Sequence, residues 1–320
     1  MSLKWDKMPE FGVENLVDND LISDLIYMIT KIASDKEAYV GTMDYQKILY
    51  LLKKNLSEDN VVKKTLQFYW YLHGPYSTLI DYGLKKHVAN GVLESYGESK
   101  GRGYVLSNGS RFSIEMELNQ KRISEDVCEI IDNYDFFKPR DEILKVIYED
   151  APFEFQRHYK LRFLPMIDEI KDESLLVVLG SGEETIMKEL MKAEAKLPLN
   201  EEFKKFHKLF SRFVTLSDTL FEKLGQEYYP EGQEYFCDIA EEMWSVFCRK
   251  LRILEHDPYY DNKVDEWDKI YERSLKELSK KIESFEMFIN DMIVDFPDIE
   301  KARVPEDSPW GVVVQGIIRD

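Results

Sequence analysis

The sequence predicts a mainly α-helical protein with a minor β component. We expect an N-terminal winged-helix-like domain with a β-hairpin wing, followed by a C-terminal antiparallel helical bundle. Three observations predict this fold: apolar residues recur at helical spacing, a Gly-Pro turn separates two N-terminal helices, and a glycine-rich segment joins two alternating stretches. With 320 residues, 44% of them hydrophobic, the chain is long enough for two or three domains.

The first two predicted helices lie between residues 20 and 56. In DLISDLIYMITKIA, which Asp20 can cap, one face carries Leu21, Leu25, Ile26, Ile29 and Ile32. In TMDYQKILYLLKKNL, the apolar stripe consists of Tyr45, Ile48, Leu49 and Leu52. The next stretch, VVKKTLQFYWYL, fits a strand as well as a buried helix because it is rich in aromatic residues.

A turn at Gly74-Pro75 precedes the next predicted helix, which Ser77 can cap and which Gly91 would end. We expect the inward face of this helix to carry Leu79, Ile80, Gly83, Leu84 and Val88, and the outward face to carry Asp81, Lys85, Lys86 and Asn90. Strands over 92–96 and 103–106 would then form a hairpin around GESKGRG. In a winged helix, the helix after the turn occupies the recognition-helix position and this hairpin is the wing.

Three regions follow from these patterns: a winged-helix-like domain over 19–118, a mixed α/β connecting region over 119–199, and an acidic helical bundle with a C-terminal strand over 200–320. In the middle region, PFEFQRHYKLRF and SLLVVLGSG are expected strands, whereas PRDEILKVIYED and GEETIMKELMKAEA are expected helices. The sequence leaves open whether this region folds with the first or the last domain. The bundle rests on apolar stripes that run from Phe203 to Leu224, Phe236 to Leu254 and Tyr271 to Phe296, and the tail WGVVVQGII is the expected strand.

Composition limits the classes of function. No apolar run approaches the ~20 residues of a membrane span, so no membrane association is expected. The scattered cysteines, Cys128, Cys237 and Cys248, indicate a reducing compartment and a cytoplasmic protein. The net charge of −18 argues against extensive nucleic-acid binding, yet residues 36–111 hold 11 Lys and Arg against 7 Asp and Glu, while the rest of the chain is strongly acidic.

Motifs for catalysis are weak, so no catalytic residue, cofactor or metal is predicted, although an enzyme whose residues meet only in the fold stays an alternative. Glu154 and His158 have the i, i+4 spacing of metal ligands, but the expected strand would separate them. VVLGSGEET has the layout of a phosphate loop but lacks its third glycine and its Lys-Ser/Thr pair. A helix start capped by Ser181 or Gly182 is the simpler interpretation.

The segments QKILYLL, FYWYLHGPYSTLI and GVLE, within about residues 20–115, resemble the Panacea (SocA-like antitoxin) family and its phage-associated relatives. The resemblance implies a compact, winged-helix-like helical module. Members act as antitoxins that neutralise toxins by direct contact, or as adaptors to protein degradation. The signature turn, implied to contact the partner, would be His73, Gly74, Pro75, Tyr76 and Ser77. This chain departs from many relatives in the long acidic bundle behind the module.

Two main hypotheses follow. The first is a non-enzymatic interaction module, antitoxin-like or adaptor-like, that binds a toxin-like or regulatory protein. The alternative is a winged-helix DNA-binding transcriptional regulator, aided by a homodimer that aligns two basic faces. Its DNA contacts would be Lys63, Lys64, Lys85, Lys86, Asn90, Lys100 and Arg102. Solvated lysines on a helix surface are the simpler account of these side chains.

Overall fold

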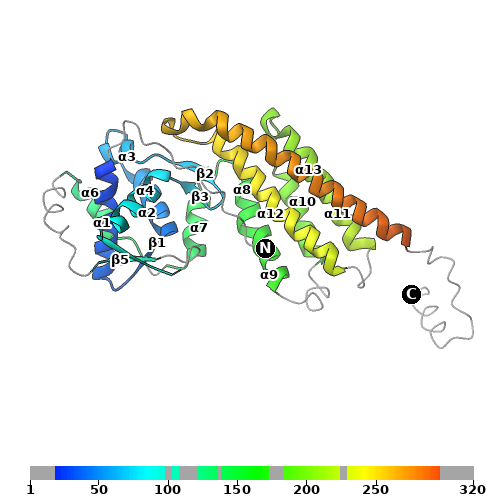
Figure 1. Cartoon of the computed structure of the whole chain (residues 1–320), viewed down its shortest axis with the longest axis horizontal. Coiled ribbons are helices and arrows are strands. Elements are labelled where there is room, and N and C mark those ends of the chain that lie inside the picture. The colour runs from blue at the N-terminus through cyan, green and yellow to red at the C-terminus, as the bar shows by residue number, and fades with distance from the viewer. Residues whose placement is uncertain are drawn as a thin grey trace, which may run out of the picture. The chain divides into compact units, whose positions relative to one another are not determined.

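The computed structural model describes residues 19–97, 103–107, 122–135, 138–172, 183–223 and 229–295. The chain is mainly helical, with a small antiparallel sheet and a C-terminal helical region, as predicted. It divides into two compact units (Figure 1). The N-terminal unit comprises Met1–Ile147 and Glu255–Asn262, and the helical unit comprises Tyr148–Leu254 and Lys263–Asp320. The predicted boundaries at 118/119 and 199/200 do not coincide with this division, which separates the middle region at residue 147.

Helices and short strands alternate in the N-terminal unit. Its elements are α1 (Asn19–Asp35), β1 (Val40–Gly41), α2 (Thr42–Asn55), α3 (Val61–Thr65), β2 (Tyr69–Tyr71), β3 (Gly74–Tyr76), α4 (Thr78–Ala89), β4 (Leu93–Tyr96), β5 (Gly103–Leu106), α6 (Glu125–Asp132) and α7 (Arg140–Tyr148). One antiparallel sheet has the strand order β1-β5-β4, and β2 pairs with β3 in a separate hairpin. The predicted hairpin of β4 and β5 is therefore confirmed, whereas its connection, with Lys100 and Arg102, lies outside the described residues.

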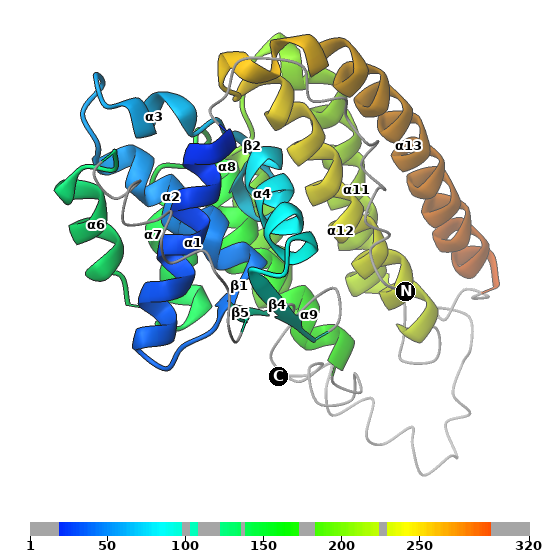
Figure 2. The same cartoon turned by 60° about the vertical axis from the view of Figure 1, so that its left-hand side comes forward.

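Helix α4 packs closely on α1, and Figure 2 shows the two helices side by side. The predicted inward residues Leu79, Ile80, Gly83 and Leu84 are buried, and a Cβ atom on Gly83 would lie 2.6 Å from Cδ1 of Ile26. Val88 is the exception, because 37% of it is exposed. Gly91 ends the helix with a φ of +68°, a conformation that favours glycine.

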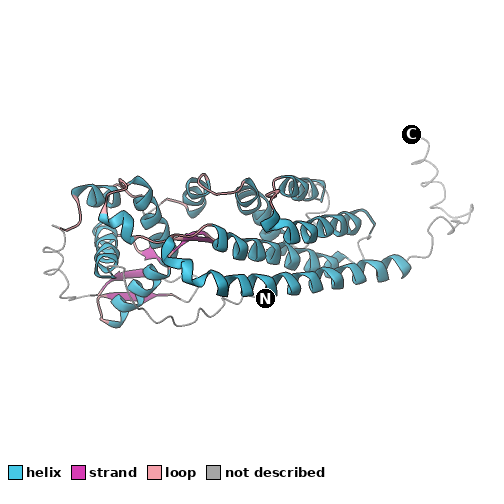
Figure 3. Cartoon of the chain, turned by 90° about the horizontal axis from the view of Figure 1, so that it is seen from above, coloured by secondary structure: helices cyan, strands magenta, loops and turns pink. Residues whose placement is uncertain are grey.

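The helical unit contains no strand among its described residues (Figure 3). Its elements are α8 (Glu154–His158), a π-helical turn (Tyr159–Phe163), α9 (Leu164–Asp172), α10 (Glu183–Ala195), a 3₁₀ turn (Glu201–Phe203), α11 (Lys204–Lys223), α12 (Tyr229–Leu254) and α13 (Val264–Asp295). Helices α11, α12 and α13 pack on one another along the three predicted stripes. A further 3₁₀ segment, η4 (Pro258–Lys263), links α12 to α13, and all but its last residue belongs to the N-terminal unit.

The prediction of a strand at PFEFQRHYKLRF is wrong, because α8 and the π-helical turn occupy this stretch from Glu154 to Phe163. Phe155, Tyr159 and Phe163 recur every four residues and are fully buried. They face an aromatic core, in which the ring centroids of Phe155 and Phe247 lie 4.5 Å apart. The prediction gave weight to the aromatic residues, which favour strands, and overlooked the spacing of four residues, which indicates a helix. The expected strands at 174–182 and 310–318 lie outside the described residues.

Candidate functional site

The signature turn, His73–Ser77, runs from the tip of a tight hairpin through β3 to the N-cap of α4. Tyr71 pairs with Gly74 at the end of β2 and β3, so Leu72 and His73 form a two-residue connection. Gly74 has a φ of +91°, which explains why glycine follows this connection. Gly74 and Pro75 are buried, whereas His73 is half-buried. The turn therefore has a structural role, which is to connect β2 and β3.

Two polar residues of α2 hold this turn from inside. The Lys47 amine donates to the carbonyl oxygen of His73 and, at 3.2 Å, to that of Pro75. The Gln46 side chain accepts the backbone N–H of Ser77 at 2.8 Å and donates to the Ser77 carbonyl at 3.0 Å. Gln46 and Lys47 are only 0% and 3% exposed, so both side chains act in the interior. Sequence analysis missed them, and the available signal was a Gln-Lys pair inside an apolar stripe.

Tyr76 is bound to the first turn of α4. Its hydroxyl donates to Oδ2 of Asp81, while Nε2 of Gln46 donates to Oδ1 of the same carboxylate at 3.2 Å. Burial raises the pKa of Asp81 above its ordinary value. Burial and the Asp81 charge both raise the pKa of Tyr76, whose phenol therefore stays protonated as a donor. Asp81 is not the solvent-facing residue that the helical pattern predicted, because Tyr76 and Gln46 draw its carboxylate inward.

The start of α4 differs from the prediction in its hydrogen bonds. Ser77 does occupy the N-cap position, but among the described residues its side chain makes no capping hydrogen bond. Instead, the backbone N–H of Thr78 donates to the Tyr260 hydroxyl at 3.1 Å. A residue distant in the chain therefore satisfies an amide of the first turn.

Among the described residues predicted to contact DNA, two lysines are paired with acidic residues. Lys63 donates to Glu58 at 2.7 Å and to the Leu56 carbonyl at 2.9 Å. Lys86 lies 3.3 Å from Asp20 on α1. Three others are exposed, as predicted: Lys64, Lys85 and Asn90. Lys100 and Arg102 lie outside the described residues.

The outer face of α4 is apolar and aromatic as well as basic. The term "outer face of α4" denotes Tyr82, Lys85, Val88 and Ala89, all of which are exposed and lie within two turns of the helix. Tyr82 is 45% exposed, a large fraction for an aromatic side chain. Aromatic side chains are enriched in protein interfaces, whereas lysine is depleted from them, so Tyr82 is the residue of this face that most resembles an interface.

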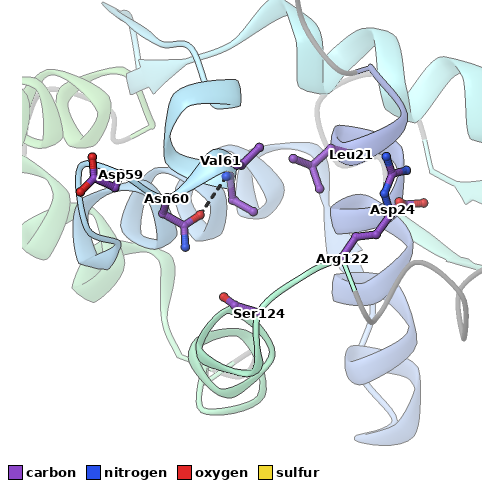
Figure 4. A pocket seen from close by; sticks show the side chains of 8 residues that line it. Leu21, Asp24, Asp59, Asn60, Val61, Arg122 and Ser124 are labelled. Atoms are coloured by element: carbon purple, nitrogen blue, oxygen red, sulfur yellow. Dashed lines mark hydrogen bonds between the residues drawn. The ribbon is translucent and has the colours of Figure 1, made fainter.

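A pocket of about 460 Å³ lies elsewhere in the N-terminal unit, between α1, the start of α3 and the residues before α6 (Figure 4). Figure 4 shows Arg122 pointing toward Asp24, a carboxylate residue that is only 3% exposed. Asn60 caps α3 by accepting the N–H of Val62 at 2.8 Å. The lining residues that the structure describes include one hydroxyl, that of Ser124, but no His, Cys or Lys.

The structure does not assemble the metal pair considered above. Glu154 and His158 do lie on one helix, but Glu154 bonds Lys196 at 3.2 Å while His158 lies 3.2 Å from a carboxylate oxygen of Glu189. Across the described ranges, no group of three His, Cys, Asp or Glu side chains is arranged to hold a metal ion. Nor does any helix in those ranges have the length and apolarity to cross a bilayer.

Comparison with known proteins found no matching family model, no matching curated protein and no matching solved structure. The resemblance of the His73–Ser77 turn to the Panacea family therefore stays a prediction from the sequence.

Proposed function

We propose that this protein is a non-enzymatic interaction module, antitoxin-like or adaptor-like, that binds a protein partner through the outer face of α4. One observation carries the proposal. Tyr82 and Val88 expose aromatic and aliphatic surface beside Lys85, while the neighbouring Lys86 pairs with Asp20. A partner that covers this face would remove Tyr82 and Val88 from water, which is a favourable contribution to binding.

The chemistry of this face defines the partner. Tyr, with few rotatable bonds and one polar group, is among the residues that contribute most to binding when they are covered. Lys85 would favour a partner whose apolar patch is bordered by a carboxylate. A toxin-like or regulatory protein with such a patch is the expected ligand, in agreement with the resemblance described above.

The second candidate function is DNA binding by a winged helix. It is favoured by the sheet order β1-β5-β4 and by the position of α4 directly before the β4–β5 hairpin. Affinity for DNA depends on the number of phosphates that lysine and arginine neutralise. The ion pairs of Lys63 with Glu58 and of Lys86 with Asp20 reduce that number, so we place this function second.

A photo-crosslinking experiment tests the proposal. A photoreactive residue replaces Tyr82 in the full-length protein, and a matched control replaces Met287, which is 65% exposed on α13. The protein that crosslinks only at position 82 is then purified, and its affinity is measured for the wild type, Tyr82→Ala, Val88→Asp and Met287→Ala. We expect Tyr82→Ala to weaken binding about tenfold or more and Met287→Ala to have little effect.

Selection from a random duplex library tests the alternative in parallel. A tight duplex whose affinity falls steeply with salt, and which Lys85→Glu abolishes while Tyr82→Ala does not, would favour DNA binding. Equal binding of the purified protein partner by the wild type and by both α4 variants would contradict the proposed docking face.

A further inference from the structure

The segment Glu255–Asn262 follows α12 in the sequence but belongs to the N-terminal unit. Its backbone lies along β2: the N–H of Trp70 donates to the Glu255 carbonyl at 3.0 Å, and the N–H of Asp257 donates to the Phe68 carbonyl at 2.8 Å. Between these bonds, His256 forms an antiparallel bridge with Tyr69. The segment thus adds a short third row to the β2–β3 hairpin and covers the β2 edge.

Asp257 fixes the register of this pairing. Its carboxylate oxygen Oδ2 lies 2.5 Å from the Lys53 amine of α2 and also 2.5 Å from the backbone nitrogen of Phe68, which donates to it. A charge-assisted bond to a backbone amide is stronger than a neutral bond and is sensitive to position. A shift of the segment by one residue would break both contacts.

Tyr260 connects the segment to α4. Its side chain is 3% exposed, and its ring meets that of Tyr69 edge to face with centroids 4.8 Å apart. The hydroxyl accepts the N–H of Thr78 at 3.1 Å and donates to the Gln67 carbonyl at 3.4 Å. The phenol is therefore joined both to the chain entering β2 and to the first residue of α4.

We propose that Asp257 and Tyr260 are positioning residues for partner binding, because they set the start of α4 and so the orientation of its outer face. Neither residue belongs to α4, so Tyr260 acts through the backbone of Thr78 and Asp257 through that of Phe68, the residue before β2. The inference rests on the proposed function, since it concerns the same binding face. Loss of either anchor would reduce the fraction of molecules with α4 correctly oriented, and the apparent affinity falls in proportion to that fraction.

The test uses full-length Tyr260→Phe, which keeps the ring and removes the hydroxyl, and Asp257→Asn, which removes the charge. Tyr259→Phe, one residue away, is the matched control. Amide hydrogen exchange in the free protein reports the anchoring directly. We expect exchange at Thr78 and in the first turn of α4 to rise at least tenfold in Tyr260→Phe and to stay unchanged in Tyr259→Phe.

Affinity for the crosslinked partner is the second measurement. Ile131→Val, a core change in α6, controls for a general loss of stability. We expect both anchor variants to weaken binding at least fivefold, and Ile131→Val to leave it unchanged at temperatures where all variants are folded.

The two proposals fail in distinguishable ways. Unchanged exchange in Tyr260→Phe, or unchanged affinity in both anchor variants while Tyr82→Ala weakens binding, overturns the positioning role. Raised exchange in Tyr260→Phe, together with an unchanged affinity for the partner in Tyr82→Ala, contradicts the proposed docking face. The role of the two anchors in binding would then be contradicted as well.

Discussion

The hydroxyl of Tyr260 lies 3.1 Å from the backbone nitrogen of Thr78, although 182 residues separate the two in the chain. Thr78 begins α4, where helical amides need an acceptor from outside the helix. The local serine expected to cap this helix makes no capping hydrogen bond, and a distant tyrosine accepts the first helical amide. Burial raises the pKa of Tyr260 to about 12, so the phenol remains a neutral hydrogen-bonding group at physiological pH.

Replacing Gln46 with leucine should destabilise the N-terminal unit. The substitution keeps the side-chain size but leaves the buried N–H and C=O of Ser77 without their side-chain partner. We expect the free energy of unfolding to fall by about 3 kcal/mol in urea titrations. Gln67→Leu is the control, because the Gln67 amide donates to the exposed Lys64 carbonyl, and a change below about 0.5 kcal/mol is expected. Equal losses in the two variants would contradict the role of Gln46.

Introducing valine at Gly83 should disturb the contact between α4 and α1. The new Cβ would approach Cδ1 of Ile26 to 2.6 Å, in a core where Ile26 is fully buried. Overpacking of this kind costs about 2 kcal/mol, which thermal unfolding would detect. Ala89→Val on the exposed side of the same helix introduces the same side chain and should cost only about 0.5 kcal/mol.

The stability of the protein should depend on the titration of Asp81. Burial raises its pKa, so the folded state holds the proton more tightly than the unfolded state. That contribution is fully present below the unfolded pKa of about 4 and is lost as pH rises through the folded pKa. The free energy of unfolding of the wild type should therefore decline relative to Asp81→Asn as pH rises above about 4. Urea titrations across this range test the sign, and a difference that grows in favour of the wild type would refute it.

Truncating Phe155 should strongly destabilise the helical unit. The ring is fully buried, with centroids 4.5 Å from Phe247 and 5.5 Å from Phe210. Phe155→Ala should lower the free energy of unfolding by about 4 kcal/mol, because a large cavity replaces many close contacts. Met287→Ala, on the exposed side of α13, should change it by less than about 0.5 kcal/mol. If the two variants unfold at similar urea concentrations, the assignment of Phe155 to this core is wrong.

The three cysteines should report on the two units separately. Cys128 is half-buried in α6 of the N-terminal unit, whereas Cys237 and Cys248 are buried in α12. Burial raises the pKa of Cys237 to about 12, which leaves little reactive thiolate. A thiol reagent at pH 8 should thus modify Cys128 first, as peptide mass spectrometry can show. Modification of Cys237 or Cys248 at the same rate in the native protein would contradict this packing.

The elements whose signals are local could be predicted from the amino-acid sequence. The stripes of α1, α2, α4 and α11–α13, the glycine that ends α4 and the two strands of the β4–β5 hairpin follow from periodicity and turn chemistry, and the structure confirms them. Such signals depend on residues within a few positions of one another, so a single sequence contains them. The turn predicted at Gly74-Pro75 lies slightly earlier in the chain, because Leu72 and His73 form the connection and both Gly74 and Pro75 belong to β3.

Features that depend on partners distant in the chain could not be predicted and follow from the folded arrangement. Residues 154–163 are helical because Phe155 and Tyr159 find an aromatic core on other helices, which outweighs their preference for strands. Asp81 turns inward because Tyr76 and Gln46 bind it. The contact of Tyr260 with Thr78 joins residues that are 182 positions apart, and no local sequence pattern around either residue predicts it. Side chains far apart in sequence are brought together by burial of apolar surface, and this burial depends on the whole fold.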